Sequence, residues 1–326
     1  MLIFGRMERK WNMALGALGA RAAARISWAC GLSGLLAAAA FSQSTGGYVP
    51  ARKGIEFGLN FGVYQANHKA ATAFYSGTGY YDIGDNTARM YEIEERLLLN
   101  ANTWNQVLNS IGLEAGEYRY IEYPYEMRYQ VAPMFGLQTL LFFNPESAFV
   151  LHVDAISGLK SQGGFNIVST DVDFGQGSEN RRTYGIFSTE DRLLLSLGYR
   201  TAAYIQDEVS WVIELGGTML NTRLQENYVR IENRNYDLMI GVQGNTAINR
   251  PTSALTATGF GFYGVLGIEL MFEEGGNLIL SARVSRDDVR LGIDPELSYR
   301  DNLWQAGLYL TWVIPPQIGD FVRAKF

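Results

Sequence analysis

Eight stretches of the chain alternate apolar and other residues with a period of two, and one face of each stretch carries no charged side chain. A period of two is that of a β-strand, because successive side chains point to opposite sides of the pleat. In the first stretch, Ile55, Phe57 and Leu59 share a face. The eight expected strands are 53–65, 127–142, 148–160, 191–202, 210–224, 259–272, 278–291 and 303–314. An uncharged apolar face on every strand suits lipid better than water.

The connections between these stretches alternate between long and short. Those before the third, fifth and seventh strands are short, and the turn formers Asn144-Pro145 and Gly275-Gly276 lie in two of them. In a membrane barrel, short periplasmic turns alternate with longer external loops, and the ring must close because an open edge in lipid leaves backbone groups unpaired. The pattern therefore predicts an all-β, transmembrane, up-and-down antiparallel β-barrel of eight strands. A soluble β-sandwich would also show period-two strands, but the sorting of connection lengths favours the barrel.

A ten-stranded barrel is the alternative. Residues 165–169 can pair with 184–188, and 228–232 can pair with 236–240 around a turn at Asn233-Arg234-Asn235. If the second pair crossed the bilayer, the barrel would have ten strands. Its arms are short for a crossing, which favours strand extensions outside the membrane and eight strands in the ring.

The N-terminal part of the chain has the features of an export signal. Arg21 and Arg25 precede an apolar run over Ile26–Phe41, and Ala40-Phe41-Ser42 resembles a cleavage site. We therefore expect a signal peptide over 1–42 and a barrel over 43–326. Cys30, the only cysteine, would leave with the signal, although a lipid-anchored cysteine is an alternative. The net charge of −6 comes without a basic block, which argues against a nucleic-acid partner.

The first long loop, 66–126, contains an apolar stripe at helical spacing. The stripe predicts one or two short amphipathic helices that form a cap over the external mouth of the barrel. Such a cap either anchors the loop to the barrel rim or binds a protein or small-molecule partner. The residues of the stripe are Met90, Ile93, Leu97, Trp104, Val107 and Leu108.

The strand faces opposite the apolar ones carry acids and bases in nearly equal number. An eight-stranded barrel is just wide enough for side chains to fill it, and buried charges must be paired. We therefore expect a closed lumen plugged by ion pairs. By the same alternation Lys160 and Asp287 point inward or lie near the outer rim. The predicted lumen network is Glu56, Arg128, His152, Asp154, Arg192, Arg200, Glu214, Glu269 and Arg283.

An enzymatic site is the weaker alternative. A lipid-modifying barrel enzyme would need a nucleophile, a base and an orienting acid within hydrogen-bond reach. His152, Asp154 and Ser196 have the right residue types, but no local motif supports them. The other histidine, His68, is expected in solvent beside Lys69. No spacing of Cys, His, Asp and Glu matches a metal site, so no cofactor is expected.

Four segments resemble a group of poorly characterised outer-membrane barrels of the Bacteroidota: 73–79, 93–97, 127–129 and 190–195. The resemblance implies a small up-and-down barrel in the cell outer membrane, with membrane lipid as its surroundings, and implies no activity. The expected function is a non-enzymatic barrel with a structural role in the envelope or a binding role of its loops. The alternative is a narrow channel for small solutes or apolar molecules.

Overall fold

A computed structural model describes most of the chain after residue 51. The described residues are 52, 54–75, 93–98, 101–114, 116–122, 127–170, 179–206, 208–238, 241–243, 246–248, 256–272, 276–291 and 299–315. The expected signal peptide, 1–42, lies outside them. No helix in the described ranges is long and apolar enough to cross a membrane.

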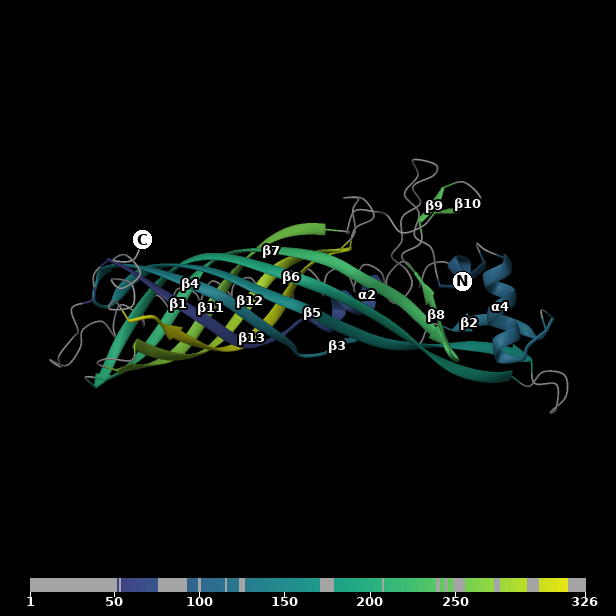
Figure 1. Ribbon diagram of the computed structural model, residues 1–326, viewed down its shortest axis with the longest axis horizontal. Coiled ribbons are helices and arrows are strands. Elements are labelled where there is room, and N and C mark those ends of the chain that lie inside the picture. The colour runs from purple at the N-terminus through teal and green to yellow at the C-terminus, as the bar shows by residue number, and fades with distance from the viewer. Residues whose placement is uncertain are drawn as a thin grey trace, which may run out of the picture.

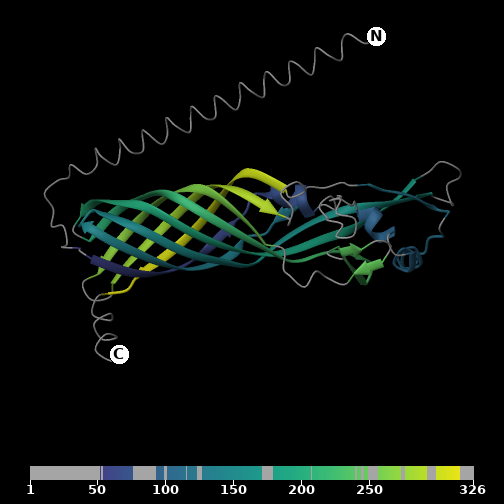
Figure 2. The ribbon, with the colours of Figure 1, turned by 90° about the horizontal axis from the view of Figure 1, so that it is seen from above.

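Eight antiparallel strands form a closed ring, as the sequence predicts (Figures 1 and 2). Each strand pairs with its neighbour around the ring, and the pairing of the first strand with the last and of β7 with β11 completes it. The eight strands are β1 (Gly54–Gln65), β4 (Ala132–Asn144), β5 (Ser147–Thr170), β6 (Glu179–Gln206), β7 (Val209–Ile231), β11 (Thr256–Phe272), β12 (Gly276–Leu291) and β13 (Tyr299–Val313).

The strand register determines the width of the barrel. One row of paired residues starts at Gly54 and returns to β1 at Tyr64, ten residues further along the strand. With eight strands, a shift of ten residues tilts the strands by about 40° and gives a backbone radius of about 8 Å at standard spacings. Side chains can fill so narrow an interior. The row passes through Phe142, Ala148, Arg200, Glu214, Val265, Arg283 and Gly307.

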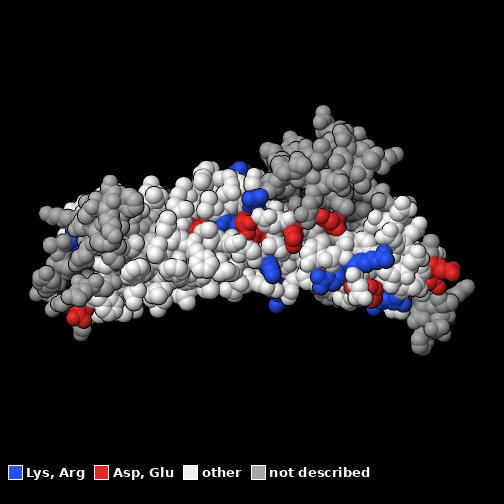
Figure 3. Space-filling model, viewed as in Figure 1, with Lys and Arg blue, Asp and Glu red and all other residues white. Residues whose placement is uncertain are grey.

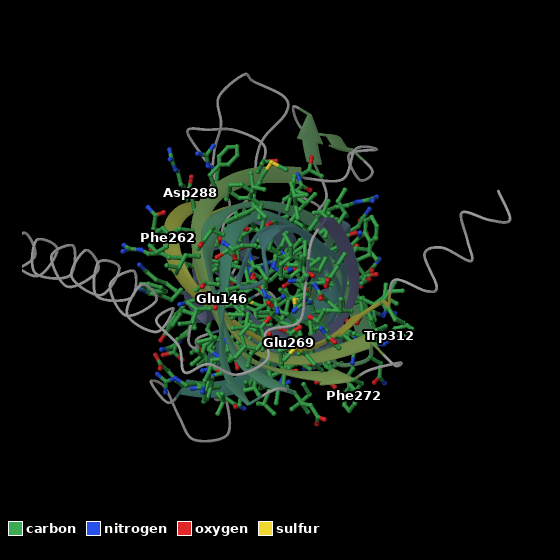
Figure 4. All side chains as sticks on the ribbon, turned by 90° about the vertical axis from the view of Figure 1, so that its left-hand side faces the viewer. Glu146, Phe262, Glu269, Phe272, Asp288 and Trp312 are labelled. Carbon is green, nitrogen blue, oxygen red and sulfur yellow. The ribbon has the colours of Figure 1, made fainter. Side chains whose placement is uncertain are left out.

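The outer face of the ring is an apolar band. On β6, outward side chains from Leu193 to Ile205 cover about 30 Å along the barrel axis at this tilt, close to the band of a membrane barrel. Leu197 is 64% exposed and Phe262 is 50% exposed. Charged side chains on the face shown in Figure 3 gather beyond the band and at its far end. Seen along the barrel in Figure 4, Phe262, Phe272 and Trp312 lie on the outside of the ring.

Three strands continue far beyond the band and build an extension at one end of the barrel. β5, β6 and β7 have 24, 28 and 23 residues, whereas β1 has 12. We call the opposite end, which carries turns such as Pro145-Glu146, the turn end. The extension also contains the short strands β2 (Tyr118–Glu122), β3 (Arg128–Tyr129) and β8 (Arg234–Asp237), and a hairpin of β9 (Gly241–Gln243) and β10 (Thr246–Ile248) lies beside it.

Both predicted hairpins form in this extension, with registers that differ from the expected ones. Residues 165–169 pair with 180–184, four positions before the expected partners 184–188, and residues 228–231 pair with 234–237. Among the described strands, β8 pairs with β7 alone and does not enter the ring, so the described ring has eight strands. The second turn lies at Glu232-Asn233, where Glu232 adopts a left-handed φ of 51°.

The described part of the first loop contains three helices: α2 (His68–Tyr75), α3 (Ile93–Leu98) and α4 (Ala101–Ile111). The apolar stripe faces inward. Ile93, Leu97, Val107 and Leu108 are buried in the core of the extension, and Trp104 packs edge-on against Tyr118 with ring centroids 4.7 Å apart. Met90 lies outside the described residues. The helices α3 and α4 therefore form an integral wall of the extension and not a separate lid.

A β-bulge in β5 corrects the expected position of Lys160. The register with β6 shifts between Ile156 and Leu159, and Gly158 has a left-handed φ of 65°. The Asp191 carboxylate accepts a hydrogen bond of 2.8 Å from the Gly158 backbone N–H and so supports the bulge. The extra residue reverses the alternation, so Leu159 is buried and Lys160 is exposed on the outer face.

Candidate functional site

The barrel interior is the most charged buried region of the described chain, and Glu269 organises its turn end. This buried carboxylate, seen inside the ring in Figure 4, accepts hydrogen bonds from Arg52 at 2.9 Å, Arg200 at 3.1 Å, Ser210 at 3.3 Å and Asn277 at 2.8 Å. Two guanidinium groups therefore share one carboxylate. Four donors satisfy the acceptor sites of a buried acid and offset its loss of hydration.

Arg52 closes this end of the barrel. Its guanidinium also pairs with Glu56 at 2.6 Å and lies over the Phe142 ring, 4.3 Å from the centroid. A cluster of buried apolar side chains, which includes Phe142, fills the same end of the barrel. They are Leu140, Phe142, Ala148, Val150, Val212, Ile279 and Val313.

Glu214 holds the middle of the lumen. His152 Nε2 lies 2.8 Å from its Oε2, the Gln138 amide donates to its Oε1 at 3.2 Å, and Arg200 Nη1 lies 3.8 Å away. All of these side chains are buried. Since Arg200 also contacts Glu269, one arginine joins the middle of the lumen to the turn end.

A second cluster lies beside this one and contains Asp154. Asn60 donates to Asp154 at 2.9 Å, and Arg283 Nη1 lies 3.4 Å from the same carboxylate. Arg283 also donates to the Ser196 hydroxyl at 2.7 Å, and its guanidinium lies 4.4 Å from the centroid of the Tyr263 ring. The arginine is thus held by an acid, a hydroxyl and an aromatic face.

Arg192 fills the lumen next to the extension. It pairs with Glu190 at 2.6 Å and donates to Tyr64 at 3.1 Å and to Gln305 at 2.8 Å. Its guanidinium also lies 5.2 Å from the centroid of the Tyr129 ring. Beyond this level most of the buried side chains are apolar and continue into the core of the extension, beside a few buried serine and asparagine side chains.

The structure therefore places eight of the nine predicted lumen residues inside the barrel and joins them into contacting clusters. The exception is Arg128, which is exposed on the outer face of β3. Gln130 and Val131, both exposed, separate β3 from β4 and break the alternation, so Met127 and Tyr129 point inward instead. The expectation that Arg128 points inward is wrong for this reason.

Two charged members of the lumen network were not predicted: Arg52 precedes the first period-two stretch, and Glu190 precedes the expected start of its strand. Asp287, which was expected inside the barrel or near its outer rim, is fully buried. Glu190 has the same even parity as Arg192 along β6, so a longer strand would have included it. Arg52 gave no periodic signal, because it lies outside a strand.

The residues of the weaker enzymatic alternative do not assemble into a nucleophile–base pair in the described structure. Ser196 and His152 are cross-strand neighbours, but the Ser196 hydroxyl donates to Thr218 at 3.1 Å and accepts from Arg283. His152 instead contacts Glu214 and Asn60. His68 is exposed, and its Nδ1 accepts a hydrogen bond from the Tyr129 backbone at 2.9 Å. The described residues contain no group of three His, Cys, Asp or Glu side chains that could hold a metal.

Comparison with known proteins finds no matching family model and no matching curated protein. Among solved structures, the chain is similar to the outer membrane protein OprG from Pseudomonas aeruginosa, with a TM-score of 0.35, 8% identity, and coverage of 81% of this chain and 97% of that chain. It is also similar to Ail, the attachment invasion locus protein of Yersinia pestis, in complex with the heparin analogue sucrose octasulfate. That match has a TM-score of 0.30, 10% identity, and coverage of 81% and 99%.

The closed ring and its apolar outer band make this chain an outer-membrane β-barrel. Every strand of the ring has lipid-compatible side chains outward, and each described ring strand pairs with a neighbouring strand on both sides. A closed barrel is the one β-structure that satisfies every backbone group in lipid. The charges lie inside, where they pair with one another.

The packed interior predicts that the barrel does not conduct ions. Apart from Glu56, which is partly exposed, the paired side chains at the turn end, in the middle and next to the extension are nearly inaccessible to water. We expect the purified full chain to show no steady current in a planar bilayer. A porin reconstituted in the same bilayer serves as the positive control. A stable open-channel current from the unmodified protein would contradict a closed lumen.

Proposed function

We propose that this chain is a non-enzymatic outer-membrane barrel that displays a rigid extracellular body for binding a partner. The proposed orientation places the turn end in the periplasm and the extension outside the cell, because short turns face the periplasm and long loops face outward in other membrane barrels. Residues 1–42 would direct export. The resemblance to outer-membrane barrels of the Bacteroidota agrees with this placement.

The observation that carries the proposal is the continuous apolar core of the extension. Strands β5, β6 and β7 leave the barrel without a break, and α3, α4, β2 and β8 pack with them. Buried side chains such as Phe165, Ile186 and Val229 join this core to the barrel. A body with its own core holds its surface in a defined shape, which a binding scaffold needs and a closed pore does not.

One face of the extension has the composition of a binding surface. A row of cross-strand neighbours runs over four strands: Gln162, Phe187, Tyr228 and Asp237. The Phe187 and Tyr228 rings stack with centroids 5.5 Å apart, and the Arg230 guanidinium lies 5.2 Å from the Phe187 ring centroid. Partly exposed aromatic and arginine side chains are enriched at the centres of protein interfaces.

A photo-crosslinking amino acid tests this surface in intact cells. Placed at Tyr228, it is expected to yield a discrete adduct of the full chain. The same amino acid at Leu197, on the lipid-facing band, is the control and should give none of that species. Adducts that are identical at the two positions, or none at Tyr228, would overturn a binding role of this face.

Deletion of the cap helices gives a further prediction. Without residues 86–112 the barrel should still fold, because the pairing of the eight ring strands does not involve α3 or α4. The extension should lose its order, since Ile93, Leu97, Val107 and Leu108 supply part of its core. We expect a folded band that resists heat on a gel, together with loss of the Tyr228 adduct. A deletion variant that fails to fold would show that the barrel itself depends on the cap.

A further inference from the structure

Next to the extension, a helix replaces part of one strand in the wall of the barrel. β1 ends at Gln65, which pairs with Ala306, whereas β13 reaches back to Tyr299. The segment 299–305 of β13 therefore has no β1 partner. The helix α2 takes the place of the missing strand, at the junction of barrel and extension in Figures 1 and 2.

Side chains attach α2 on both sides. Towards β13, Asn67 donates to the Trp304 carbonyl at 3.2 Å and Lys69 pairs with Asp301. Towards β3, His68 accepts from the Tyr129 N–H at 2.9 Å, and Thr72 donates to the Met127 carbonyl at 3.2 Å. A helix attached by side chains does not seal a barrel wall as completely as a ladder of backbone hydrogen bonds does.

An open groove of about 350 Å³ lies at this junction, within the size range of small-molecule sites. Val284, Trp304 and Ala306 line it from the lipid-facing wall, and Gln65, Asn67 and His68 line it from the rim. Val284 and Trp304 are each 50% exposed, and Ala306 is the small residue opposite Val284. The groove is thus apolar towards the membrane and polar towards water.

A cation without an acidic partner lies at the boundary of the groove. Arg286 lies on the outward face of β12, two residues beyond Val284, and its guanidinium lies 5.7 Å from the centroid of the Trp304 ring. Within the described ranges, no carboxylate forms an ion pair with Arg286, because the nearby Asp288 is held by Arg290 and Arg300. A guanidinium at the edge of an apolar band suits a phosphate.

We propose that this groove binds one membrane lipid of the leaflet on the extension side. An acyl chain lies against Val284, Trp304 and Ala306, and the lipid phosphate contacts Arg286. The small side chain of Ala306 leaves the space that the chain occupies. The site is independent of the partner surface on the extension, since it needs only the barrel wall and α2.

Binding of phosphatidylglycerol to the delipidated full chain tests the proposal, with native mass spectrometry counting the lipids retained. The unmodified protein should retain one lipid after the others have been stripped. Ala306→Trp fills the groove and should weaken this binding roughly tenfold or more, the equivalent of about 1.4 kcal/mol. The matched control is Ala282→Trp. Ala282 also faces outward, on the neighbouring strand β12, but it does not line the groove, so this variant should retain the lipid.

A head-group variant separates the phosphate contact from the apolar one. Arg286→Gln should weaken phosphatidylglycerol binding roughly tenfold and leave diacylglycerol binding nearly unchanged. Equal retention by the Ala306 and Ala282 variants, or equal loss of both lipids in Arg286→Gln, would overturn the proposed site. Heat resistance of each variant on a gel verifies folding, and Val284→Trp replaces Ala306→Trp if the latter does not fold.

Discussion

Replacement of Glu269 by alanine should destabilise the barrel more than any other single change in the lumen. The carboxylate pairs with both Arg52 and Arg200, and its removal leaves two buried guanidinium groups without their shared acid. Breaking one buried pair costs about 3–5 kcal/mol, because an uncompensated charge remains out of water. Among the described carboxylates, Arg200 then keeps its longer contact of 3.8 Å with Glu214. The measurement is the urea midpoint of the purified barrel.

Two variants serve as controls for this effect. Glu269→Gln keeps the shape and part of the hydrogen bonding, so its midpoint should lie between those of the alanine variant and the unmodified protein. Glu208→Ala, at an exposed turn at the same end of the barrel, should change stability by about 0.5 kcal/mol or less. An unchanged midpoint in Glu269→Ala would show that the pairs at the turn end do not hold the barrel together.

An arginine on the lipid-facing band should block stable assembly. Leu195 on β6 and Leu266 on β11 point outward within the band, with 37% and 54% of their surface exposed. A cation near the midplane of the membrane costs about 2–4 kcal/mol, because the guanidinium loses its hydration and finds no partner there. We expect Leu195→Arg and Leu266→Arg each to lower the yield of the folded, heat-resistant band on a gel.

Position on the barrel, and not the loss of leucine, should decide this result. Leu195→Ala and Leu266→Ala shorten the same side chains without adding charge, so they should assemble nearly as well as the unmodified protein. Thr183→Arg, exposed on β6 in the extension, introduces the same cation outside the band and should also be tolerated. Normal heat resistance of both leucine-to-arginine variants would contradict the assignment of this face to lipid.

Local alternation was sufficient to predict the eight strands, the apolar band and most of the lumen network. The period of two places His152 and Asp154 on one face of β5, and Arg192 and Arg200 on one face of β6, before any neighbour is known. Helical spacing likewise predicted the buried positions of Ile93, Leu97, Val107 and Leu108. These features depend on each residue and its near neighbours in the chain.

The positions that alternation misassigned lie where a strand is interrupted. The bulge at Gly158 moved Lys160 outward, and the break at Gln130–Val131 moved Arg128 outward and Tyr129 inward. A bulge adds one residue, and one residue exchanges the two faces of the strand beyond it. The left-handed backbone at Gly158 is supported by Asp191 from the next strand, a contact that no local pattern contains.

The sequence by itself determined which residues face lipid and which face inward along each uninterrupted strand, because side-chain direction follows from backbone geometry. Only the tertiary structure decided which buried charges meet. Arg52, outside any strand, reaches Glu269 across 217 positions, and α2 replaces β1 beside β13. Partners so far apart in the chain are brought together by the ring register and by the path of the first loop. The ring register and the path of the first loop produce no periodic pattern in the sequence, since both depend on how the strands align once the ring has closed.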